Sequence, residues 1–314
     1  MTKLTRFFPF DEPLVLLTLI FALVSYRALA QQPSTDLEEE EQTRMLWNTT
    51  FIEKRPAAKK AGTVSGGGPA PQSRKPAPAS KTQSASQTSD IGDALVGVTI
   101  WSLREPESRD DPSASIRSLS GGEQWTPIRV EADTPLSEGE KIRVSFEAVR
   151  TGYLYVIDRE QYADGTFGPP SLIFPTLQTH NGNNEVSPGR LIEIPALDDD
   201  PPYFTMQANR PDQVAELLTV IVAPEPLPGV KIGLEPLPVS PVQVRAWEQQ
   251  WGVQVKRLEA RGQAGKPYTK AEKEAGLERT RLLAHEEPLP QTMYHLDAMP
   301  SAPLLFSIPL RIAR

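Results

Sequence analysis

The sequence contains no cysteine, which excludes disulfide bonds, thiolate metal sites, thiol catalysis and lipoprotein anchoring. It has only three histidines, His180, His285 and His295, and none of them stands in an H-E-x-x-H spacing. Neither a Walker loop nor a G-x-S-x-G nucleophile elbow occurs. A hydrolase site would have to be assembled from distant loops, and we expect no cofactor.

Aromatic residues are also scarce, at 7% of the 314 residues, whereas proline occurs 32 times. This composition predicts long loops around a core built mainly from Val, Ile and Leu. Residues 91–314 carry 31 acidic and 22 basic side chains, a net charge of −9. An acidic surface repels phosphate backbones, so we expect no nucleic-acid partner; the simpler interpretation of the charge is solubility.

The first thirty residues have the order of a secretory signal. Lys3 and Arg6 precede an uncharged apolar run of 11 residues, Leu14 to Val24, and Ala28-Leu29-Ala30 follows it as a cleavage site. Spanning a bilayer takes about 20 residues. We therefore expect residues 1–30 to be removed, no transmembrane segment to remain, and the protein to be periplasmic or extracellular in a bacterium. An uncleaved anchor is the alternative.

Two further segments precede the folded part. Residues 55–90 consist mainly of Pro, Ala, Ser, Gly and Lys, which predicts a disordered, mildly basic linker. Residues 31–54 combine an acidic run with an apolar cluster in which Trp47 and Phe51 are spaced to share a helix face. This segment either docks on a partner or on the domain through those two residues, or it is a weakly structured patch.

Residues 91–223 have the pattern of an antiparallel β-structure. In 141–149, Ile142, Val144, Phe146 and Ala148 alternate with polar residues, which predicts a strand with one wet face. Further strand candidates are 94–103, 127–131, 152–158, 171–174, 190–194, 203–206 and 216–223. Many short strands separated by Gly, Pro and Asn turns favour a sandwich over a βαβ sheet.

The pattern changes after Pro226. We expect partial helix in 242–258 and a second helix from Thr269, whose spacing to Glu272 matches a capping box, to about Leu283. Residues 304–312 read as a final strand, with Pro309 at an edge or bulge. The predicted fold is thus mainly β. It is an antiparallel β-sandwich (Ig-like or jelly-roll-like) over 91–314, with a C-terminal helical insertion at 226–300 and a returning final strand.

A core at 141–226 resembles the DUF4384 family, a domain of unknown function in bacterial exported proteins. The resemblance lies in the order of several short elements: Gly-Tyr-Leu-Tyr at 152–155, Ile157-Asp158, Phe174-Pro175, an Asn-rich loop at 181–184, Gly189 before Ile192-Glu193-Ile194-Pro195, and a late strand at 218–223. It implies a β-sandwich-like fold and no known catalytic residues. It says nothing about 242–283.

Two groups are candidate site residues. Tyr153 and Tyr155 point to one face of a strand and form either a ligand platform or a core-flanking pair that fixes the corner. Asp198, Asp199 and Asp200 are weak candidates for a hard cation such as calcium, although adjacent carboxylates point in different directions on an extended backbone. A solvated loop is the simpler interpretation of the three aspartates.

Two classes of function fit these features. The first is a non-enzymatic exported module that binds a protein or a cell-wall glycan. The alternative is an envelope hydrolase whose site is formed by the loops 158–170, 180–188 and 196–203. An enzyme should bring polar side chains with shifted pKa values into a cleft, whereas a binding module should present an aromatic or apolar patch.

Overall fold

The computed structural model describes residues 41, 45–57, 94–260, 262–277, 280–299 and 301–313. By its internal contacts the chain divides into residues 1–44 and 45–314, and all that follows concerns the second unit. The predicted signal at 1–30 and most of the predicted linker at 55–90 lie outside the described residues. In the described part, no helix has both the length and the apolar character needed to cross a membrane.

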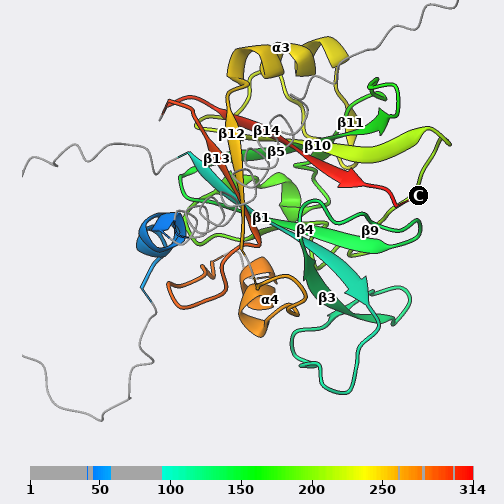
Figure 1. Ribbon diagram of the computed structural model, residues 1–314, viewed down its shortest axis with the longest axis vertical. Coiled ribbons are helices and arrows are strands. Elements are labelled where there is room, and N and C mark those ends of the chain that lie inside the picture. Colours follow the sequence, from blue (N-terminus) through cyan, green and yellow to red (C-terminus); the bar gives the residue numbers. More distant parts are fainter. Residues whose placement is uncertain are drawn as a thin grey trace, which may run out of the picture. The chain divides into compact units, whose positions relative to one another are not determined.

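The fold is mainly β, with 37% strand and 14% helix, and its two antiparallel sheets pack on each other (Figure 1). The strand order of the first sheet is β12 (Val255–Glu259), β13 (Thr292–Leu296), β1 (Leu95–Arg104), β3 (Gln124–Val130) and β2 (Ile116–Arg117). Beside β1 also lies β4 (Lys141–Ala148), which in turn pairs with β8 (Ile192–Ile194) and β9 (Phe204–Thr205). The second runs β11 (Leu237–Pro238), β6 (Ser171–Phe174), β5 (Gly152–Tyr162), β10 (Gln213–Ala223), β14 (Leu304–Arg311), with β7 (Glu185–Val186) beside β5. The predicted sandwich is confirmed.

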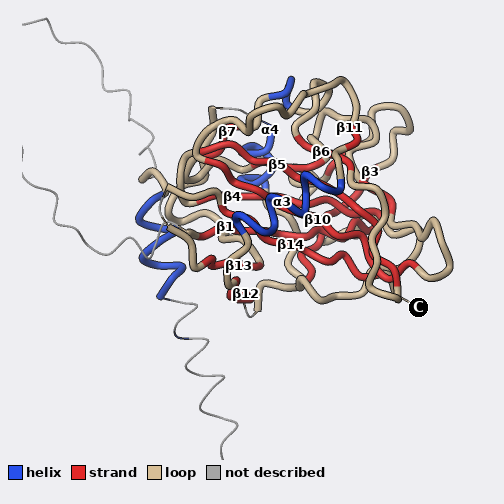
Figure 2. The backbone as a smooth tube through the Cα atoms, turned by 90° about the horizontal axis from the view of Figure 1, so that it is seen from above, coloured by secondary structure: helices blue, strands red, loops and turns tan. Residues whose placement is uncertain are grey.

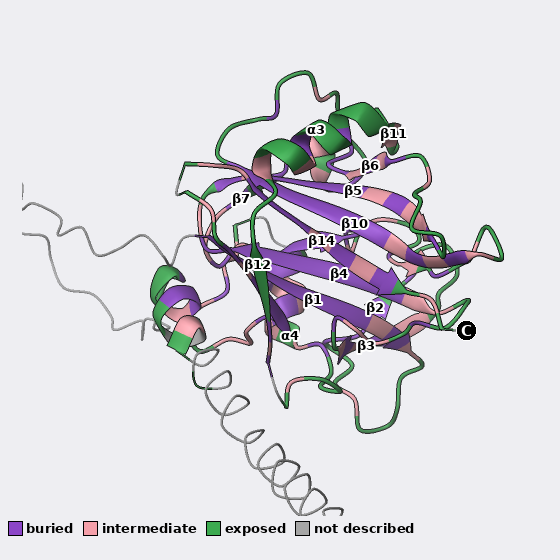
Figure 3. Cartoon of the chain, turned by 45° about the horizontal axis from the view of Figure 1, so that its top comes forward, coloured by how far each residue is buried: buried purple, intermediate pink, exposed green. Residues whose placement is uncertain are grey.

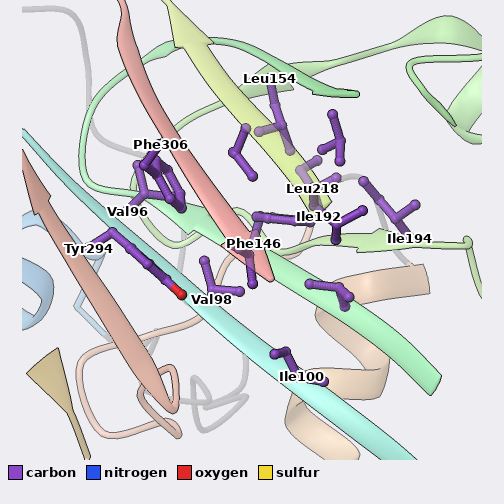
Figure 4. Close-up of a cluster of buried hydrophobic side chains, with 14 of the residues drawn as sticks. Val96, Val98, Ile100, Phe146, Leu154, Ile192, Ile194, Leu218, Tyr294 and Phe306 are labelled. Carbon is purple, nitrogen blue, oxygen red and sulfur yellow. The ribbon is translucent and has the colours of Figure 1, made fainter. Parts of the chain in front are cut away.

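The main core lies between the sheets, because period-two alternation turns one apolar face of each strand inward. Val98 and Ile100 of β1 meet Phe146 of β4, Leu154 of β5 and Phe306 of β14 in one buried cluster (Figure 4). Each such side chain contributes roughly 1.5–3 kcal/mol when fully buried. The alternation therefore fixes which face of every long strand is internal.

The helices are short and lie outside the two sheets. They are the π-helical η1 (Trp47–Ile52), the 3₁₀ turn η3 (His180–Gly182), α3 (Pro241–Trp251) and α4 (Lys270–Leu277). Figure 2 shows α3 lying across the outer face of the second sheet. The predicted capping box of α4 is present: the Thr269 amide donates to Glu272 Oε2 at 3.0 Å, and the Glu272 amide donates to Thr269 Oγ1 at 3.3 Å.

The predicted helical insertion is only partly helical. Helix ends at Trp251, and residues 255–259 then form β12, which pairs with β13 at the edge of the first sheet. The exposed edge strand β12 was missed because it carries Lys and Arg in place of an apolar alternation. The buried strand β13, with the sequence TMYHL, was missed as well. The final strand returns as predicted, since β14 pairs with β10 and ends the order of the second sheet.

The predicted wet face of β4 is wrong. Arg143, Ser145 and Glu147 are 1%, 3% and 2% exposed, because other segments cover the outer face of the first sheet. These covering segments are residues 45–57, α4 and the loop 283–290, and Figure 3 shows the strands beneath them as buried. Period-two alternation separates apolar from polar faces, but it does not tell whether the polar face meets water.

Candidate functional site

Two arginine–glutamate pairs fasten the cover to the first sheet, and a third lies within the sheet, between β4 and β8. They are Arg55–Glu147, Arg129–Glu272 and Arg143–Glu193, all nearly inaccessible to solvent. Burial raises the pKa of Glu193 and of Glu272. The cavity between Glu147 and Glu272 measures only about 10 Å³, room for one water at most. Because no substrate could enter, we interpret this charged layer as structural.

The predicted docking segment folds back on the domain. Phe51 is 1% exposed and packs against Leu95, Leu258 and Met293. Four residues later, Arg55 donates to both carboxylate oxygens of Glu147 at 2.7 and 2.6 Å, and to the carbonyls of residues 284, 287 and 288. The side chain of Trp47, the other candidate, lies outside the described residues.

A pocket with a largely apolar wall lies between β5, β6 and α3, and we name it the β5–α3 pocket. It has a volume of about 400 Å³. Tyr155, Ile157 and Leu172 form its sheet side, Gln243 and Trp247 its helix side, and residues 227–231 and 237–240 its rim. Lys231 is its one charged lining residue. Such a mostly apolar wall with a few polar groups is typical of a binding site.

Local sequence explains how this pocket is built. Pro241 stands at the start of α3, where a missing amide hydrogen costs nothing, and Val244 and Trp247 turn toward the sheet. The rings of Trp247 and Trp251 stack at 5.9 Å with an angle of 12°. An ion pair between Arg159 of β5 and Glu248 of α3 holds the helix over the sheet.

Both predicted tyrosines belong to this side of the second sheet. Tyr155 lines the pocket, and its buried hydroxyl accepts a hydrogen bond from the Leu227 amide at 2.9 Å. Tyr153 packs, partly buried, on the same apolar cluster. Tyr155 therefore supports the rim loop and forms part of the pocket wall.

The three aspartates line a second hollow of about 520 Å³, which we name the acidic cleft. Asp199 accepts from the Thr179 hydroxyl at 2.7 Å, and Asp200 accepts from the Ser118 hydroxyl at 2.9 Å. The carboxylates thus serve different loops. In the part of the chain that the structure describes, no three His, Asp or Glu side chains gather as a metal site would need.

The three loops proposed for a hydrolase do not form one cleft. The acidic cleft takes its lining from residues 173–179, 194–204 and Pro236, and none from 158–170 or 180–188. His180 lies with its Nε2 at 3.3 Å from the Glu193 carbonyl oxygen, and burial lowers its pKa. Two further carboxyl groups with raised pKa values lie outside this cleft, on β5 and β10.

Asp158 of β5 and Glu216 of β10 form a half-buried carboxyl pair that sequence reading missed. Burial raises the pKa of Asp158 to about 6, and burial together with the Asp158 charge raises the pKa of Glu216 to about 7. The two come together through the β5–β10 register, which pairs Glu216 with Glu160 and Leu218 with Asp158. Neither carboxyl lines the β5–α3 pocket or the acidic cleft.

Comparisons with known proteins find no matching family model, no matching curated protein and no matching solved structure. The functional argument therefore rests on the geometry of the described residues. Trp247 is the principal pocket residue that the sequence did not reveal. Only its helical spacing to Val244 hinted at an inward face, and nothing local indicated that this face covers Tyr155.

Proposed function

We propose that the chain is a non-enzymatic exported binding module, which recognises a protein or cell-wall component through the β5–α3 pocket. The observation that carries the proposal is the pocket itself, an apolar wall with Tyr155 and Trp247 and one charged lining residue. Two exposed aliphatic side chains lie close to the pocket in the sequence, Leu234 between the two rim segments and Val242 in the first turn of α3, and each is 66% exposed. Exposed apolar surface beside a pocket is typical of an interaction site.

Export rests on the signal-like order of residues 1–30, and the resemblance to DUF4384 fits the same proposal. The alternative, an envelope hydrolase, is favoured by one observation only. The raised pKa values of Asp158 and Glu216 suit a general acid near neutral pH. Loss of a hydrolytic activity in both Asp158→Asn and Glu216→Gln would support that alternative.

The proposal is tested by a substitution that places a larger side chain in the pocket at an exposed residue. Gln243 lines the pocket from α3, so Gln243→Trp should block it, whereas Gln249→Trp places the same side chain on an exposed position of the same helix. Each form is used as bait against envelope proteins and against purified cell-wall glycan. We expect a partner that the unmodified chain and Gln249→Trp retain and that Gln243→Trp loses. Equal retention by all three would refute this site.

A deletion of residues 31–54 would be a poor test of binding. Removing Phe51 opens the buried cluster around Met293, so lost binding could reflect a damaged domain. Substitution at an exposed pocket residue separates recognition from folding.

A further inference from the structure

The lining of the acidic cleft carries negative charge. Asp198, Asp199 and Asp200 line it, and no Lys, Arg or His is among its lining residues. The side chains that donate to Asp199 and Asp200 are the uncharged hydroxyls of Thr179, Ser118 and Ser120. A ligand of this cleft should therefore be cationic.

Apart from Thr176, Gln178 and Thr179, the rest of the cleft is lined by apolar, aromatic and proline side chains. Ile173 and Phe204 form part of its wall at the margin of the main core, and Tyr203 and three prolines complete much of the surface. Lys141 lies over the ring of Tyr203 at 5.2 Å, from outside the lining, which demonstrates that a cation stacks on this ring. Grooves of aromatic and apolar side chains are the usual receptors of proline-rich peptides.

The chain itself contains a segment with both properties. Residues 69–78 read PAPQSRKPAP, with four prolines, Arg74 and Lys75, and no acidic side chain. They belong to residues 58–93, which lie outside the described part and join Ala57 to Ala94, both on the domain. Charge and composition of this segment are complementary to the cleft.

The stretches of chain on either side of residues 69–78 are long enough for the segment to reach across the domain. Pro69 stands twelve positions after Ala57, and Ala94 stands sixteen positions after Pro78; when extended, these stretches span about 40 and about 53 Å. A folded domain of this size has a radius of gyration of about 17 Å, so both lengths are comparable with its diameter. We propose that the acidic cleft docks residues 69–78 of the same chain.

Intramolecular docking needs only weak intrinsic affinity. A flexible tether gives an effective concentration of millimolar order, so a segment that binds in trans with a Kd of about 1 mM is docked in a large share of molecules. The contact is largely electrostatic and exposed, and it should weaken as the Debye length falls from about 10 Å at 0.1 M salt to about 3 Å at 1 M. The proposal does not depend on the β5–α3 pocket.

The absence of cysteine allows a single spin label in the full chain. With the label on Ser73→Cys, we expect the amide signals of Gln178, Asp198 and Tyr203 to lose at least about half of their intensity. Adding Arg74→Glu and Lys75→Glu should restore them, because the segment then repels the cleft. Both substituted positions lie outside the described residues, and we expect the stability of the domain to stay unchanged. Equal broadening with and without charge reversal, or broadening at another surface, overturns the proposal.

A mixing experiment identifies the occupant. Spin-labelled chains without isotope are mixed with isotope-labelled chains without spin label. If docking is intramolecular, the mixture shows no broadening in the cleft at micromolar concentration. Broadening there assigns the cleft to the segment of a second copy and refutes the intramolecular form. A free peptide of residues 69–81 should displace the tethered segment at millimolar concentration, and failure to do so at low salt also counts against it.

Discussion

The buried ion pair of Arg55 gives the sharpest test of how the N-terminal segment is held. In Arg55→Met the side chain keeps much of its length but loses five hydrogen bonds, two to Glu147 and three to backbone carbonyls. Glu147 then remains 2% exposed without its cation. The variant thus isolates the cost of an uncompensated buried carboxylate.

The expected loss is large. Breaking one side of a buried ion pair costs about 3–5 kcal/mol of the free energy of unfolding. For a domain of this size, each kcal/mol lowers the melting temperature by about 2–4 °C, so we expect a drop of about 6–20 °C. In the double variant Arg55→Met/Glu147→Met both charges are gone, and at least about 2 kcal/mol of the loss should return.

The assay is urea unfolding followed by tryptophan fluorescence and circular dichroism. Arg109→Met is the matched control, because Arg109 is 80% exposed and pairs with Glu107 at 2.8 Å on the surface. Exposed pairs contribute about 0–1 kcal/mol. If Arg55→Met costs no more than Arg109→Met, or if the double variant is as unstable as the single one, the segment is not held by this ion pair.

Three further predictions concern other buried groups. The folded-state pKa values of Asp158 and Glu216, about 6 and about 7, exceed the ordinary values of about 4. The folded state therefore binds more protons than the unfolded state in this range. Its stability falls as the pH rises from about 4 to about 7. Across that range the free energy of unfolding, measured by urea unfolding, should fall by roughly 2–4 kcal/mol in total. Asp158→Asn should remove most of this pH dependence, and an unchanged pH dependence contradicts the pairing. Gly276→Ala would improve helix propensity by about 1 kcal/mol, but its Cβ would overlap the carboxylate of Glu193. We therefore expect a net loss of about 1–3 kcal/mol in the free energy of unfolding, measured by thermal unfolding. A gain in stability would be evidence against this packing. Thr269→Ala should cost about 0.5–2 kcal/mol, with Thr269→Ser close to neutral, because only a hydroxyl caps α4.

The sequence predicted most of the long strands and the last strand of the sandwich. Period-two alternation in 141–149 places Ile142 and Phe146 inward, and the structure confirms this because both lie in the main core. The capping box at Thr269 was equally readable, since three residues of local sequence determine it. These features depend on near neighbours in the chain.

The missed features depend on distant partners. Arg143 and Glu147 look like solvent-facing residues of a strand, and only the cover formed by residues 45–57, α4 and 283–290 makes them internal. The wall of the β5–α3 pocket joins Tyr155 to Trp247, ninety-two residues apart, through a helix whose place over the sheet no local pattern indicates. A candidate site whose walls come from residues so far apart in the chain can be recognised only from the three-dimensional structure.

The most direct test of the central claim is hydrogen exchange of the full chain with and without the partner retained from the envelope. The account predicts slower amide exchange in β5, the rim residues 227–240 and the first turns of α3. Unchanged exchange there, with slower exchange confined to other surfaces, would contradict recognition through the β5–α3 pocket.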